Sequence, residues 1–118
     1  ILERYRGIGG GSLDIRLVHA ETQASGAVAE YVRSVHQGAP WDIVVVDGLE
    51  ESYVSRMDCL RETLGAITPG GMLILDDAYR SVYSHVPALL KGCERLVFRG
   101  LGSARLGVTQ TDVYVVPF

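Results

Sequence analysis

Two short apolar stretches of this chain each end in carboxylic acids. Residues 43–46 are followed by Asp47, and residues 72–75 are followed by Asp76 and Asp77. Each stretch has the length and the unbroken apolar character of a strand buried on both faces, which is typical of a parallel sheet. Ligands of such folds bind at the carboxyl ends of the strands. We therefore expect the three acids to lie together at one edge of a sheet.

Acids placed in this way allow two interpretations. Neighbouring strands are about 5 Å apart, and carboxylates that close repel each other unless one is protonated or a cation lies between them. One prediction is therefore a Mg²⁺ or Ca²⁺ ion held by Asp47, Asp76 and Asp77, because these ions prefer oxygen ligands. The two adjacent acids can face one ion only if the strand ends there and the chain turns. The alternative is that the acids cap the segments that follow them.

The elements that would position these acids alternate along the chain. Apolar runs and helical periodicity predict strands near 14–19, 42–47 and 72–76, with helices over 24–37, 52–66 and 84–91. The loop between two last strands, near 96–98 and 113–116, has few helix signals, so we expect these strands to be antiparallel neighbours. The fold class is α/β, with a mostly parallel sheet in three layers.

Length and composition exclude several classes of protein. A chain of 118 residues is one domain, and 47% apolar residues are enough for a core. The net charge of −3 argues against a nucleic-acid or anionic-membrane partner, and no apolar run is long enough to span a membrane. Cys59 and Cys93 show neither metal-ligand spacing nor a disulfide framework, so we expect a cytoplasmic protein.

A glycine-rich segment, Glu21 and the histidines give weaker indications of a functional site. The glycines of residues 7–11 have no strand before them and no helix after them, so they do not form a nucleotide-binding loop. Glu21 follows the first predicted strand and either accepts a hydrogen bond from an adenine amine or is a first-turn helix acid. His19, His36 and His85 are scattered, and none is assigned a catalytic role.

The order of these segments resembles the carboxyl-terminal half of class I S-adenosylmethionine-dependent methyltransferases. The matching features are residues 41–48, a helix, and residues 64–77 with their Pro-Gly-Gly turn. Asp47-Gly48 followed by Asp76-Asp77 is most similar to the metal-dependent O-methyltransferases. Residues 107–116 resemble the closing antiparallel strand of that family.

This resemblance implies a Rossmann-like fold and transfer of a methyl group from S-adenosylmethionine to a hydroxyl of a small molecule. Asp47, Asp76 and Asp77 fall on the positions of the family's metal ligands. The metal would hold the deprotonated hydroxyl facing the methyl sulfonium. Asp47 would also contact the cofactor and serve as the catalytic residue.

The resemblance spans residues 13–117, and the family's first strand and glycine-rich cofactor loop would precede it. We therefore expect residues 1–12 to be a flexible lead-in or the end of a preceding helix. Residues 13–118 would be the carboxyl-terminal half of a methyltransferase domain, inactive by itself. Ala20, Glu21 and Thr22 would lie near the adenine of the cofactor.

Two further expectations concern partners. The alternative to an enzyme is a non-enzymatic α/β module, either a degenerate methyltransferase homologue or an interaction domain. Without a first strand beside it, the strand at 42–47 has a bare apolar edge, and such edges pair with other chains. We therefore expect a homo-oligomer formed through this edge.

Overall fold

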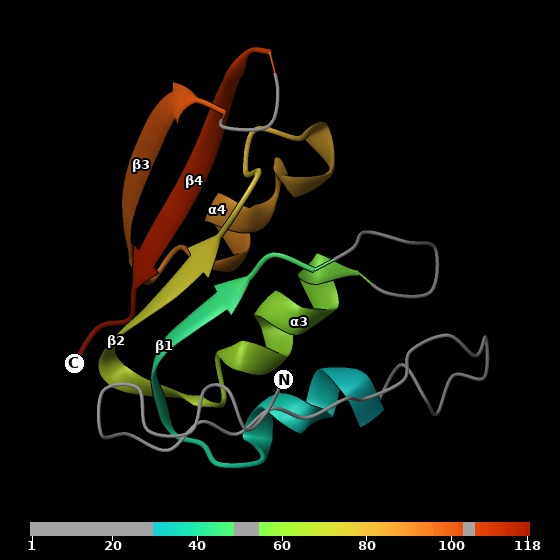
Figure 1. Ribbon diagram of the computed structural model, residues 1–118. Coiled ribbons are helices and arrows are strands. Elements are labelled where there is room, and N and C mark those ends of the chain that lie inside the picture. The colour runs from blue at the N-terminus through green and yellow to red at the C-terminus, as the bar shows by residue number, and fades with distance from the viewer. Residues whose placement is uncertain (1–29, 49–54, 103–105) are drawn as a thin grey trace, which may run out of the picture.

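The computed structural model describes residues 30–48, 55–102 and 106–118. Residues 30–33 are helical and lead into the 3₁₀ turn η2. The elements that follow (Figure 1) are η2 Ser34–His36, β1 Trp41–Val46, α3 Arg56–Thr63, β2 Ile67–Leu75, the 3₁₀ turn η3 Ser81–Tyr83, α4 Val86–Leu89, β3 Glu94–Leu101 and β4 Val108–Val115. The strand predicted at 14–19 and the lead-in at 1–12 lie outside the described residues.

The strands form one mixed sheet in the order β1-β2-β4-β3. β1 is parallel to β2, whereas β4 is antiparallel to both of its neighbours. The α/β class, the parallel pairing of the two strands that end in acids, and the antiparallel final pair are therefore confirmed. The described sheet is not mostly parallel, however, because β4 inserts between β2 and β3 and makes two antiparallel pairings.

The described helices lie on one face of this sheet (Figure 1). β2 and β3 run in the same direction, since both are antiparallel to β4. The connections through α3 and α4 are therefore two parallel crossovers that advance in the same direction across the sheet. Crossovers of this kind are almost always right-handed, which places both of their helices on the same side.

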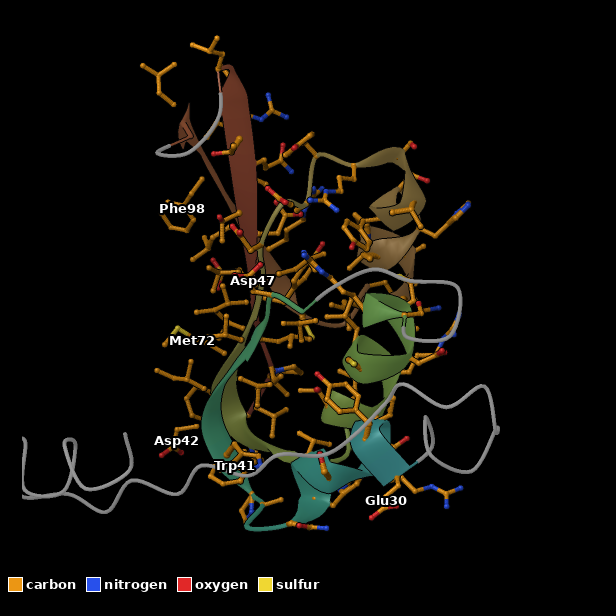
Figure 2. The ribbon with its side chains drawn as sticks, turned by 45° about the vertical axis from the view of Figure 1, so that its right-hand side comes forward. Glu30, Trp41, Asp42, Asp47, Met72 and Phe98 are labelled. Carbon is orange, nitrogen blue, oxygen red and sulfur yellow. The ribbon has the colours of Figure 1, made fainter. Side chains whose placement is uncertain are left out.

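The opposite face, called here the open face, carries apolar side chains with no described helix over them. Ile43 is 52% exposed and Val45 is 60% exposed, and the register places both on this face. Figure 2 shows Met72 and Phe98 pointing away from α3. The prediction that β1 is buried on both faces, and with it the three-layer arrangement, is therefore wrong for the described residues.

The core lies between the sheet and the helices. Its side chains come from the covered face of β1, β2 and β4 and from the apolar side of α3, η3 and α4. The buried members are Val46, Leu60, Ile67, Leu73, Leu75, Tyr83, Val86, Leu90 and Tyr114. Cys59 and Cys93 pack against this cluster.

Local signals explain where the elements begin and end. The side chain of Ser55 accepts a hydrogen bond from Met57 N at 3.1 Å and so caps α3. The helix predicted over 84–91 is shortened to α4, and η3 precedes it. Ser84 does not cap a helix, because its N–H closes η3 by donating to the carbonyl of Ser81. Pro87 does lie in the first turn of α4. None of the helices in the described ranges has the length and apolar character that a membrane span requires.

Candidate functional site

The predicted meeting of two strand ends is present at the carboxyl end of the parallel pair. Val46 pairs with Leu75, so Asp47 and Asp76 follow at the same height of the sheet. The backbone N–H of Asp76 donates to the carbonyl of Val46 at 3.3 Å and extends the ladder by one bond. The two loops that carry the acids therefore start from neighbouring positions.

The chain turns immediately after β2, as a shared site would require. Asp77 adopts a left-handed backbone with φ 53°, a conformation that aspartate tolerates better than most residues. Its carboxylate pairs with Arg80 three residues later. Desolvation opposes the charge of Arg80, but the hydrogen bond and the charge of Asp77 raise the pKa of Arg80 above its usual value.

Asp76 faces a different partner. Its Oδ1 accepts a hydrogen bond from Thr111 Oγ1 of β4 at 2.8 Å. In addition, the N–H of Ala78 donates to the carbonyl of Gln110 at 2.8 Å. The inserted strand β4 therefore fixes the turn that follows β2.

Asp47 lies beside a buried arginine. Its side chain is 58% exposed, and Oδ1 is 3.5 Å from Nη2 of Arg56, whose side chain is only 6% exposed. Arg56 also donates from Nε to the carbonyl of Gly48 at 2.6 Å and from Nη1 to the carbonyl of Asp76 at 2.9 Å. One guanidinium thus contacts the ends of both β1 and β2.

The three carboxylates, as they lie, do not fit one shared divalent ion. Asp47 is paired with Arg56, Asp77 with Arg80, and Asp76 with Thr111. Within the described ranges, no three side chains of His, Cys, Asp or Glu come together as metal ligands. The capping alternative is not seen here either, because α3 is capped by Ser55 and the residue before η3 is Arg80, with no side-chain cap.

Sequence reasoning missed the partners of the acids. Arg80 has a local signal, since an arginine three residues after an aspartate lies within reach across one turn. Arg56 and Thr111 have no such signal. Arg56 contacts Asp47 from beyond the segment that separates β1 from α3 and also reaches the backbone carbonyl of Asp76, 20 residues away, and Thr111 lies 35 residues from Asp76. Finding them requires the strand order.

The adenine-side residues Ala20, Glu21 and Thr22 lie outside the described part of the chain. His36, the last residue of η2, bonds through Nε2 to Glu62 at 2.8 Å in an exposed pair. A scan of protein-family models finds no match to this chain, and a search of curated proteins finds no similar sequence.

Proposed function

We propose that this chain is the carboxyl-terminal half of an S-adenosylmethionine-dependent methyltransferase domain, acting on a hydroxyl group of a small molecule. The observation that carries the proposal is the β1-α3-β2 unit, which brings Asp47 and the Asp76-Asp77 pair to adjacent strand ends. This is the place where parallel α/β sheets bind ligands. The antiparallel β4, pairing with β2, adds support because the resembled family also closes its sheet with an antiparallel strand.

Asp47 is the residue proposed to meet the ligands. Its carboxylate is more than half exposed, although Arg56 lies beside it. In this position it accepts a hydrogen bond from the hydroxyl of the methyl acceptor and orients its oxygen. The methyl group then moves from the sulfonium sulfur to that oxygen, which leaves a neutral thioether, and the hydroxyl proton passes along its hydrogen bond to the carboxylate of Asp47. Holding the two reactants in line supplies much of the rate.

A bound Mg²⁺ or Ca²⁺ would supply Lewis-acid activation of the hydroxyl. The acids do not jointly fit such an ion as they lie, so no step of this proposal passes through it. The ion pair between Asp77 and Arg80 would first have to break before the three carboxylates could ligate one ion. Glu21, with Ala20 and Thr22, remains the proposed adenine contact.

Titration of the chain with S-adenosylmethionine, followed by amide NMR shifts, tests the proposal. We expect weak binding, in the millimolar range, with shifts concentrated at Gly48, Asp77 and Ala78. Asp47→Asn should weaken binding, whereas Asp58→Asn should not, because Asp58 pairs with Arg61 on the exposed side of α3. Shifts that are absent from the strand ends, or unchanged in Asp47→Asn, would contradict the proposal.

A second candidate function is an interaction module without catalytic activity, located in the cytoplasm like the first. The open face and the unpaired edge of β1 in the described sheet favour it, because large exposed apolar surfaces mark protein contacts. A chain that associates through β1 and ignores S-adenosylmethionine would support this candidate over the first.

A further inference from the structure

Arg56 is a buried charge at the junction of two strand ends. Its side chain is 6% exposed, although arginine is rarely buried unless it is paired. Its three nitrogens each contact a different group: the carbonyl of Gly48, the carbonyl of Asp76 and the carboxylate of Asp47. Of these, the two carbonyls lie beyond the last residues of β1 and β2.

The position of Arg56 in its helix makes this arrangement costly. Arg56 is the first residue of α3, where the positive end of the helix dipole disfavours a cation. Burying a guanidinium adds a desolvation penalty. The compensating interactions include, among the described residues, the two carbonyl bonds, the nearby carboxylate of Asp47, and the ring of Tyr83, whose centroid is 5.7 Å from Cζ.

Geometry, as well as charge, determines which side chain can make these contacts. Guanidinium is a planar fork that directs its N–H groups to fixed positions, whereas the ammonium of lysine is a compact point charge. The bonds from Nε and Nη1 hold two carbonyls, Gly48 from the loop after β1 and Asp76 from the loop after β2. The guanidinium thereby bridges the two loops that leave the strand ends.

We propose that Arg56 is the positioning residue of the strand-end site. It fixes the separation of the loops after β1 and β2, and it holds the carboxylate of Asp47 at their junction. The ligand of this site is taken from the proposed function. The effect of Arg56 on the two loops does not depend on that function. Arg56 is not proposed to contact the ligand, and it acts on the site through Asp47, Gly48 and Asp76.

The ligand-free test compares the two ends of β1 in the Arg56→Lys variant. At the carboxyl end, Asp76 N–H donates to Val46 O, and at the amino end, Trp41 N–H donates to Ala66 O. We expect hydrogen exchange at Asp76 to accelerate at least about tenfold, equivalent to about 1.4 kcal/mol, with exchange at Trp41 unchanged. Equal acceleration at both ends means general destabilisation and overturns the proposal, as does no change at either end.

The matched control is Arg61→Lys, on the same helix. Arg61 makes an exposed ion pair with Asp58 at 3.0 Å, so its replacement should leave exchange at both ends of β1 as in the wild type. Arg56→Met serves as the uncharged comparison, and it should match Arg56→Lys if the fork matters more than the charge. A lysine variant with wild-type exchange would show that charge alone suffices.

The ligand test repeats the S-adenosylmethionine titration with the same variants at a temperature where each is folded. Arg56→Lys should weaken binding about tenfold or more, and Arg61→Lys should not. If the wild type itself does not respond to S-adenosylmethionine, the proposed function fails, and the exchange experiment still decides the role of Arg56. If the wild type responds and Arg56→Lys binds equally well, the positioning role fails alone.

Discussion

Asp112, in the middle of β4, accepts hydrogen bonds on Oδ2 from both Nε and Nη2 of Arg95 on β3, at 2.9 and 2.7 Å. Its side chain is only 2% exposed. Gln110 donates to its other oxygen at 2.8 Å, and the hydroxyl of Tyr114 lies 3.2 Å from Oδ2. A buried carboxylate thus joins β3 to β4 through two side-chain hydrogen bonds and favours the observed register of this pair.

Removing Arg95 should be costly. Arg95→Ala leaves the carboxylate of Asp112 with two neutral partners, and we expect the free energy of unfolding to fall by about 2–3 kcal/mol. The loss should be smaller than for a fully buried pair, because Arg95 is itself partly exposed. Urea denaturation measures it. Arg61→Ala breaks an exposed pair and should cost less than about 1 kcal/mol; equal losses would contradict a special role for Asp112.

Tyr114 should make stability fall at alkaline pH. Burial, followed by the charge of Asp112, raises the pKa of Tyr114 from 10.0 to about 12. Because the folded-state pKa is the higher one, its contribution is complete below pH 10 and is lost as the pH rises toward 12. Tyr114→Phe should therefore reduce the alkaline slope of the unfolding free energy, measured by urea denaturation at a series of pH values. Tyr79→Phe, at an exposed tyrosine, should keep the wild-type slope.

The sequence predicted the β1-α3-β2 unit because its signals are local. Residues 43–46 form an apolar run, and residues 68–71 form a Pro-Gly turn that precedes the second apolar run, residues 72–75. β4 was predicted only from 113 although it begins at Val108. Its buried positions include Gln110 and Asp112, so the polar residues face inward and the alternation that marks a strand is hidden.

The candidate site was predicted only in part, for a similar reason. Position along the chain indicated that Asp47 and Asp76 follow neighbouring strands, and that is correct. Which cation or donor each acid meets depends on strand order and on helix placement. Thr111 reaches Asp76 only because β4 inserts beside β2, and no local pattern encodes that insertion.

Gly71 should tolerate no side chain. An added Cβ would lie 2.9 Å from the carbonyl oxygens of Asp42 and Thr68, and backbone atoms cannot move aside as the end of a flexible side chain can. We expect Gly71→Ala to lower the free energy of unfolding by about 1–3 kcal/mol. Gly100→Ala in β3 is the control, since nothing lies within 4 Å of its added Cβ. That substitution should be neutral or stabilising by about 0.5–1 kcal/mol.

Binding of Mg²⁺ or Ca²⁺ should be weak and should depend on Arg80. The ion pair of Asp77 with Arg80 must open before that carboxylate can ligate a metal, so Arg80→Met should tighten binding measured by calorimetry. The double variant Asp47→Asn/Asp76→Asn should abolish it. Asp58→Asn/Glu62→Gln removes the same charge from α3 and should leave binding unchanged. Equal binding by the two double variants would exclude the metal site at the strand ends.

The chain should self-associate through β1. β1 is an edge strand of the described sheet, and after Asp42 it has neither charge nor proline to discourage pairing. Ile43 and Val45 add exposed apolar surface on the open face, and its burial would contribute roughly 25 cal/mol per Å². Light scattering after size exclusion should give a mass above the 12.8 kDa of one chain.

Val45→Lys should restore the monomer, because a charge at the edge opposes strand pairing. Val82→Lys should not, since Val82 is exposed on η3 outside the sheet. A wild-type chain that remains a monomer at high micromolar concentration would mean that this edge is not an interface.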